Sequence, residues 1–195
     1  MAAIIIVGNI SRGAKPVYEG ELVMDGLEAA VEVVRDERGM PHIYAESESD
    51  LYKAVGFVMA QERMWQMDLI RRATTGELSE IFGEDYVQTD LFLRSLRMTE
   101  KSKMVLQNTD PQILACLNDF VRGVNHYIGN ADKLPPEFRI LGYEPEPWTD
   151  ENIANIIGYM GWDLAGGNLS GDVFTYKPVS YTHLRAHETV LDLVC

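Results

Sequence analysis

The stretch RDERGMPHIYAESESDLYKAVGFVMAQERMWQMDLIRR, Arg35 to Arg72, changes from a turn between β-branched and aromatic residues to apolar residues at helical spacing. Gly39 and Pro41 lie in its first part, and this composition predicts a β-hairpin with Gly39 in a left-handed conformation. From about Ser49, the expected cap, the apolar spacing predicts a helix to about Arg72. The stretch therefore predicts a hairpin followed directly by a long helix.

The next hundred residues continue the helical pattern. ELSEIF, between Gly76 and Gly83, predicts a short helix, and TDLFLRSLRMTEKSKMVL predicts one or two more. The clearest helix begins with Asp110 as cap and Pro111 at the first helical position, and Gly129 is expected to close it. Its apolar stripe, expected to be buried, comprises Ile113, Leu114, Leu117, Phe120, Val121, Val124, Tyr127 and Ile128.

A proline-rich segment, KLPPEFRILGYEPEPWTD, follows and predicts an ordered crossover without helix, with its aromatic and Ile residues held against the body. Thr149 is expected to cap a last helix, DENIANIIGYMGWDLAGG. Its apolar side comprises Ile153, Ile156, Ile157, Met160 and Leu164. The pattern indicates an α+β chain, mostly helical, with no internal repeat and no second domain.

Composition and charge narrow the classes of function. The chain has 195 residues, 46% hydrophobic and 24% charged, which is typical of a globular domain. Its formal charge of -13 and pI near 4.7 argue against a nucleic-acid partner, because that affinity depends on clustered Lys and Arg. Two cysteines, Cys116 and Cys195, provide neither a disulfide framework nor metal-ligand spacing.

Both ends of the sequence differ from the central part. The start, MAAIIIVGNISRGAKP, fits two interpretations: residues 1–13 are the remnant of an export signal or anchor, or the apolar run is a buried first strand. At the other end VSYTHLRAHET resembles a translated sequencing adapter, so residues 179–195 are expected to be non-native. The native domain is expected to span residues 14–178.

Candidates for chemistry within the chain are few. His42, with Asp36 and Glu37 across the predicted hairpin, could act as a general base or metal ligand, but a structural role is favoured because no second ligand lies at metal spacing. Met59, Met64, Met67 and Trp65 form a group that core packing explains better than a cofactor site. The sequence contains no G-x-S-x-G elbow, P-loop or dinucleotide fingerprint.

Three motifs in this order resemble the penicillin acylase family of N-terminal-nucleophile hydrolases. They are an R-D-x-x-G-x-P-H-I turn, an A-Q-x-R-x-W-Q-M helix and a G-x-L-S-E-x-F-G segment, followed by LPPEFRILGYEPEPWT. The resemblance covers about Arg12 to Lys177 and corresponds to the N-terminal, α-chain part of a precursor that cleaves itself into α and β chains. It implies that the chain contributes to an αββα sandwich completed by the β chain.

The resemblance also implies an amidase that removes an N-acyl group from a β-lactam, an acyl homoserine lactone or a similar amide. The nucleophile, a serine whose own terminal amine acts as base, would open the β chain, so the chain alone is expected to be inactive and no catalytic residue is assigned to it. By similarity, Met160, Trp162 and Leu164 would line the acyl pocket, although core packing explains each of them equally well. Familiar benzylpenicillin-cleaving members carry Arg and Phe near Asp163 and Leu164, so penicillin preference is not implied.

The family resemblance implies three further properties. A structural Ca²⁺ would take Asp172 as one ligand, with a short alignment gap, and no organic cofactor is expected. The partner would be the β chain of the same precursor, and the location would be periplasmic or extracellular, with a membrane anchor at the N-terminus as one form. The alternatives are a non-catalytic helical binding module and a small metal-dependent enzyme that uses His42.

Overall fold

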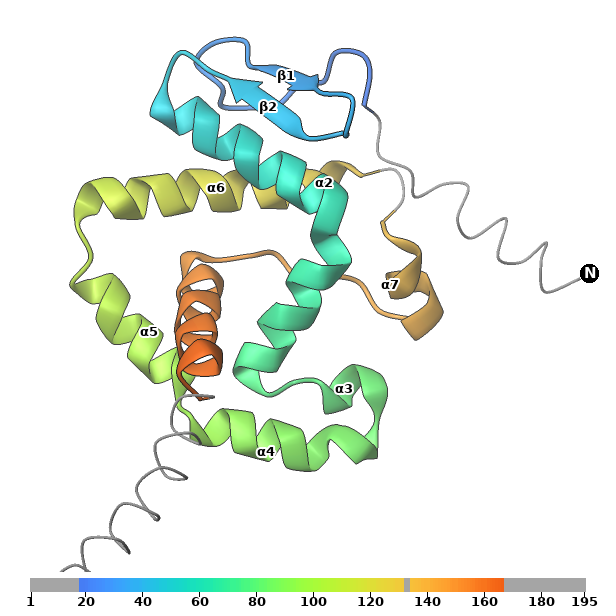
Figure 1. Cartoon of the computed structure of the whole chain (residues 1–195), viewed down its shortest axis with the longest axis vertical. Coiled ribbons are helices and arrows are strands. Elements are labelled where there is room, and N and C mark those ends of the chain that lie inside the picture. Colours follow the sequence, from blue (N-terminus) through green and yellow to red (C-terminus); the bar gives the residue numbers. More distant parts are fainter. Residues whose placement is uncertain (1–17, 132–133, 167–195) are drawn as a thin grey trace, which may run out of the picture. The chain divides into compact units, whose positions relative to one another are not determined.

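The computed structural model describes residues 18–131 and 134–166, and Figure 1 shows the order of the elements along the chain. The chain divides into two compact units, Met1–Ile156 and Ile157–Cys195, each with its own internal packing. The elements are β1 (Glu32–Arg35), β2 (Pro41–Tyr44), α2 (Glu48–Thr75), α3 (Ser79–Phe82), η1 (Glu84–Tyr86), α4 (Val87–Ser95), α5 (Met98–Gln107), α6 (Pro111–Asn130), α7 (Pro136–Leu141) and a helix over residues 150–166. The described chain is therefore helix-rich with one small sheet, which confirms the predicted α+β class.

The hairpin forms as predicted. β1 and β2 pair antiparallel, with Val34 opposite His42, and Gly39 has a left-handed backbone with φ 76°. Asp36 completes the turn, because its Oδ1 accepts hydrogen bonds from the backbone N–H groups of Arg38 and Met40, both at 2.9 Å. The hairpin lies against the first half of α2, which supplies the packing surface that two strands alone lack (Figure 1).

Helix α2 is capped two residues earlier than predicted. Ser47, not Ser49, is the N-cap: its backbone is extended (φ -124°, ψ 152°), and its Oγ accepts from the N–H of Asp50 at 3.2 Å. Ser49 lies inside the first turn, where its backbone is already helical. The helix continues to Thr75, with Gly76 at φ 69° as its C-cap, and bends at Arg63, whose backbone is not helical.

Helices α2 and α6 make the most extensive contact of the first unit and approach most closely at two glycines. A Cβ atom built on Gly56 would lie 2.0 Å from the carbonyl oxygen of Phe120, and one on Gly123 would lie 1.9 Å from that of Lys53. The core extends from this crossing along α2 and towards α7. Its buried members are Ala60, Met64, Met67, Val121, Val124, Phe138 and Trp148.

The predicted cap of α6 is correct, but the predicted end of the helix and part of its predicted buried stripe are wrong. Asp110 caps the helix through its Oδ1 and Pro111 occupies the first position, but the helix ends at Asn130, so Gly129 lies inside it. Of the predicted stripe, Val121 and Val124 are buried, whereas Ile113 is 56% exposed. The contact with α2 is centred on Phe120 and Gly123, so the first turns of α6 extend beyond the surface that α2 covers.

The proline-rich segment contains helix α7, so the prediction of a crossover without helix is wrong. Pro135 caps the helix and Pro136 occupies its first turn, where a missing N–H breaks no helical hydrogen bond. The helix places Phe138, 1% exposed, edge-on to Trp65 with ring centroids 5.5 Å apart. Ile140, expected against the body, is 67% exposed.

The last described helix follows a buried anchor. Trp148 is 3% exposed, and its backbone N–H and C=O bond to the side chain of Asn125 at 2.7 and 2.9 Å. Thr149 directly precedes the helix, as predicted for its cap, and its N–H and hydroxyl both donate to the side-chain oxygen of Asn152 in the first turn. In the first unit, Ile153 and Ile156 pack against the core, so the predicted apolar side is partly buried there.

None of the helices in residues 18–131 and 134–166 is long and apolar enough to cross a membrane.

Candidate functional site

The predicted acyl wall lies in the second unit, on the helical residues 157–166. Ile157, Met160 and Leu164 are spaced three and four residues apart, so they lie on one face of the helix. All three are exposed, at 62%, 55% and 75%. A helix with an exposed apolar face is expected to bury that face against another surface, and this face includes two of the three residues predicted to bind substrate.

The third predicted residue, Trp162, has a different environment. It is half-buried, and its ring lies 5.7 Å from that of Tyr159 at an interplanar angle of 45°. Two residues along a helix correspond to about 200° of rotation, so Trp162 does not share the face of Met160 and Leu164. The geometry thus groups Met160 with Leu164 and adds Ile157, which the sequence pattern alone did not single out as a site residue.

The proposed metal ligands find no support in the described residues. Asp172, predicted to bind Ca²⁺, lies outside them, and residues 18–131 and 134–166 contain no group of three or more His, Cys, Asp or Glu that could hold a metal ion. His42 is exposed and has Asp36 as its acidic neighbour, with Nε2 3.6 Å from Oδ2. The N–H of Met40, above all, holds the pKa of Asp36 below its ordinary value. This pair stabilises the turn of the hairpin.

A buried cluster of charges on α2 was not predicted from the sequence. Asp68 is fully buried, and its carboxylate binds Arg71 at 2.8 Å, Arg72 at 3.2 Å and the hydroxyl of Tyr143 at 2.9 Å. Burial, and then the charge of Asp68, raise the pKa of Tyr143. Burial lowers the pKa of Arg72, but its ion pair with Asp68 outweighs this and raises it. Every charge has a partner, so the cluster joins α2 to the segment after α7 and leaves no free acid or base.

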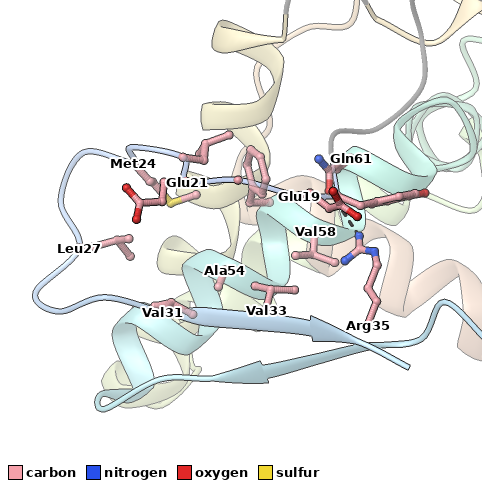
Figure 2. Close-up of a pocket in the computed structure, with 14 residues that line it drawn as sticks. Glu19, Glu21, Met24, Leu27, Val31, Val33, Arg35, Ala54, Val58 and Gln61 are labelled. Carbon is pink, nitrogen blue, oxygen red and sulfur yellow. Dashed lines mark hydrogen bonds between the residues drawn. The ribbon is translucent and has the colours of Figure 1, made fainter. Parts of the chain in front are cut away.

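A pocket of about 210 Å³ lies between α2, β1 and residues 18–31, which run across them (Figure 2). Val31, Val33 and Val58 line its apolar part, and Arg35 and Gln61 lie at one end. Its described lining residues include no Ser, Thr, Cys or Lys side chain.

Comparison with known proteins identifies the family. The sequence model described as penicillin amidase matches residues 30–192, more than four-fifths of the chain. The chain belongs to this family. It is 39% identical over 150 residues to penicillin acylase 2 proenzyme of Pseudomonas sp. (strain SE83), 77% of this chain and 19% of that protein.

Two further relatives broaden the comparison within the penicillin amidase family. The chain is 32% identical over 136 residues to penicillin G acylase of Escherichia coli, 67% of this chain and 16% of that protein. It is 32% identical over 159 residues to acyl-homoserine lactone acylase QuiP of Pseudomonas syringae pv. syringae (strain B728a), 81% of this chain and 19% of that protein. These penicillin amidase relatives thus include acylases named for two kinds of substrate.

A solved structure, the thermostable penicillin G acylase from Alcaligenes faecalis in tetragonal form, resembles the fold with a TM-score of 0.64 at 29% identity. The match covers 70% of this chain and 75% of that chain. In sequence, however, the chain spans less than a fifth of the three curated relatives named above.

Proposed function

We propose that the chain is the N-terminal, α-chain part of an acylase that hydrolyses a linear amide and releases an acyl group from an amine. One observation carries the proposal: the chain aligns over 77% of its length with a penicillin acylase proenzyme yet covers 19% of that proenzyme. The remaining four-fifths of such a protein would supply the β chain and its nucleophile. The relatives named above are all acylases, so no observation favours a non-catalytic binding module.

The chemistry of an N-terminal nucleophile explains why the reacting group would belong to the β chain and not to this chain. A serine hydroxyl becomes reactive when a base takes its proton, and a chain-terminal amine with a pKa of about 7.7 to 8.0 is such a base. The serine oxygen attacks the amide carbonyl, the amine leaves with a proton, and water then hydrolyses the ester to release the acid. Only cleavage of the precursor exposes that amine, so the protein would be made as an inactive proenzyme.

This chain would contribute one wall of the acyl pocket. The exposed face of Ile157, Met160 and Leu164 supplies apolar surface without charge, which suits the acyl part of a substrate. Trp162, on another face, would support the wall through its contact with Tyr159. Penicillins, acyl homoserine lactones and other acylated amines all remain within the proposed substrate class.

Two expectations of the family accompany the proposal. The described residues supply no set of Ca²⁺ ligands, so a calcium site would combine Asp172 with residues of the β chain, and no step of the hydrolysis passes through it. The enzyme would act in the periplasm or outside the cell, which fractionation of a producing strain tests.

A hybrid proenzyme tests the proposed function. Residues 18–166 would replace the aligned segment of penicillin acylase 2 proenzyme, and amide hydrolysis would be assayed with benzylpenicillin and an acyl homoserine lactone. Leu164→Ala should lower kcat/KM for a bulky acyl group about tenfold, because it removes apolar contact worth about 1–3 kcal/mol. Gly129→Ala, on an open surface of α6, serves as the control. A correctly cleaved hybrid that hydrolyses neither amide would overturn the proposal.

A further inference from the structure

The guanidinium of Arg35 carries a buried hydrogen-bond donor that has no acceptor among the described residues. Its Nη2 donates to Oε1 of Glu62 at 2.5 Å and to Oε1 of Gln61 at 3.4 Å, and its carbon Cζ lies 4.2 Å from the centre of the Tyr18 ring. Its Nε is buried and donates to no atom within residues 18–131 and 134–166. An aromatic face is at most a weak acceptor, so an oxygen atom of a bound molecule would satisfy this N–H.

Arg35 lies at one end of the pocket between α2 and β1, and buried groups fix the shape of this pocket (Figure 2). Asp50, fully buried, accepts hydrogen bonds from the N–H groups of residues 28–29 at 3.0 to 3.1 Å. Lys53, 4% exposed, donates to the carbonyl oxygen of Gly26 at 2.6 Å. These bonds hold the segment that crosses the pocket against α2, so the pocket exists before any ligand enters.

The inner part of the pocket suits a small apolar body. Its lining side chains there are Leu27, Val31, Val33, Ala54, Phe57 and Val58. A closed apolar cavity of about 150 Å³ binds benzene in another protein, so about 210 Å³ holds a single six-membered ring with one or two further heavy atoms.

The unsatisfied group of Arg35 is a hydrogen-bond donor and not an unpaired charge. Glu62 already compensates the positive charge of the guanidinium at 2.5 Å, and Glu19 and Glu21 line the open side of the same pocket. A carboxylate ligand would bring a further negative charge to these three. A neutral carbonyl oxygen would accept the hydrogen bond from Nε without that repulsion.

We propose that this pocket binds a small neutral carbonyl compound, with an apolar body of about one ring between β1 and α2 and its carbonyl oxygen bound to Nε of Arg35. The ring of Tyr18 covers the guanidinium but is 54% exposed, so it moves aside to admit the oxygen. The inference is independent of the acylase function, because none of these residues lies on the predicted acyl wall and binding is measured without hydrolysis.

The N–H of Arg35 itself reports the proposed bond. Acetophenone, a ring with one ketone, would be titrated into the isotope-labelled 195-residue chain, and NMR would follow the Nε–H signal of Arg35, assigned by its loss in Arg35→Lys. Acetophenone should bind with a dissociation constant on the order of 1 mM and move this proton signal downfield. No binding, or binding that leaves the signal in place, would overturn the inference.

Two probes of the same shape separate the hydrogen bond from apolar contact. α-Methylstyrene has a CH₂ group where acetophenone has its oxygen, and Arg35→Lys keeps the positive charge beside Glu62 but removes the Nε–H. This variant should weaken acetophenone about tenfold and leave α-methylstyrene unchanged. Arg38→Lys, at an exposed position outside the pocket, should weaken neither probe. Equal losses for both probes in Arg35→Lys would contradict the bond to Nε.

A charged probe tests the neutral headgroup. Benzoate should bind more weakly than acetophenone, because Glu62 already compensates the charge of Arg35. Tighter binding of benzoate would show that the pocket recognises an anion and would overturn the proposed ligand class.

Two neighbouring residues of β1 provide a matched pair that locates the ligand. Val33 lines the pocket and Val34 lies on the opposite face of the strand; they are 37% and 45% exposed. Val33→Trp should fill the pocket and abolish binding of acetophenone, whereas Val34→Trp should leave binding unchanged. Equal effects of the two substitutions would place the ligand elsewhere and overturn the inference. If Val33→Trp fails to fold, the Nε–H signal of the unmodified chain still decides.

Discussion

Gly123 of α6 lies directly against the backbone of Lys53 in α2, so close that a Cβ on Gly123 would be 1.9 Å from the carbonyl oxygen of Lys53. Gly56 makes the reciprocal approach to Phe120. Neither glycine has a positive φ, so the close approach of the two backbones, and not turn geometry, requires them. This crossing sets the distance between α2 and α6 and so the position of the core around Met64 and Val124.

The crossing predicts a large effect of one methyl group. Gly123→Ala should destabilise the chain by about 3 kcal/mol, since the clash is with backbone, which cannot rotate away. Gly129→Ala in the same helix meets nothing within 4 Å and should be neutral or stabilising by up to about 1 kcal/mol through helix propensity. Chemical denaturation of both variants measures the difference. Equal stabilities would mean that the helices do not cross here.

A buried carboxylate makes the start of α3 sensitive to acid. Asp90, 4% exposed, accepts hydrogen bonds from the N–H groups of Leu78 and Ser79 at 2.9 and 2.7 Å. Burial raises the pKa of Asp90, but the hydrogen bonds from Ser79 and Leu78 outweigh this and hold its pKa below the ordinary value. Asp90→Asn should therefore reduce the free energy of unfolding at pH 7 by about 1–3 kcal/mol.

The pH dependence of this loss follows from the direction of the shift. A carboxyl group whose pKa is lower in the folded state stabilises fully above its unfolded pKa of about 3.9, and the stabilisation is lost as the pH falls through the folded pKa. The difference between Asp90→Asn and the unmodified chain should therefore be constant near neutral pH and shrink below about pH 4. Asp85→Asn, at an exposed position, is the control. A difference that grows towards acid would show that the sign is wrong.

The hydrogen bonds between the side chain of Asn125 and the backbone of Trp148 predict that this side chain stabilises the fold. Asn125 donates to the carbonyl of Trp148 and accepts from its N–H, so Asn125→Ala leaves two partly buried backbone groups unpaired. We expect a loss of about 2 kcal/mol and a shift in the tryptophan fluorescence of the folded state. Asn118→Ala removes an exposed bond to Leu114 within the same helix and should cost less than about 0.5 kcal/mol. Similar losses for both variants would contradict the anchor.

The open face of residues 157–166 predicts the behaviour of the isolated chain. Ile157 and Leu164 are 62% and 75% exposed, and such apolar faces promote association. Replacing both with Lys should raise the concentration at which the isolated chain stays monomeric, measured by light scattering. In the hybrid proenzyme the same pair should reduce amide hydrolysis, because the face would there line the acyl pocket. If the substitutions change neither the association of the isolated chain nor amide hydrolysis by the hybrid, the face neither promotes association nor lines the acyl pocket.

Local patterns in the sequence predict the hairpin and the starts of the helices, because these depend on neighbouring residues. Gly39 and Asp110 act as their positions suggest. The predicted cap, Ser49, is wrong by two residues, because the extended backbone that a cap requires occurs at Ser47. The exposure of Ile113 could not be predicted, because it depends on where α2 crosses α6.

Less of the candidate site than of the fold could be predicted from the sequence. Helical spacing alone places Ile157, Met160 and Leu164 on one face, but their exposure depends on what covers them. The cluster of Asp68, Arg72 and Tyr143 joins residues 75 positions apart, so no local pattern reveals it. Only the part of the cluster within α2 had a local signal, because Asp68 precedes Arg71 and Arg72 by three and four residues, the spacing at which side chains on one helix meet.

The most direct test of the account compares the purified 195-residue chain alone with the same segment inside the hybrid proenzyme, using the rate of release of the acyl group from benzylpenicillin and from an acyl homoserine lactone. The account predicts no hydrolysis above the buffer rate for the chain alone, and hydrolysis of at least one amide by the cleaved hybrid. Turnover by the chain alone at an enzyme-like rate of about 1 s⁻¹ or more would contradict it, since the reacting hydroxyl would then belong to this polypeptide.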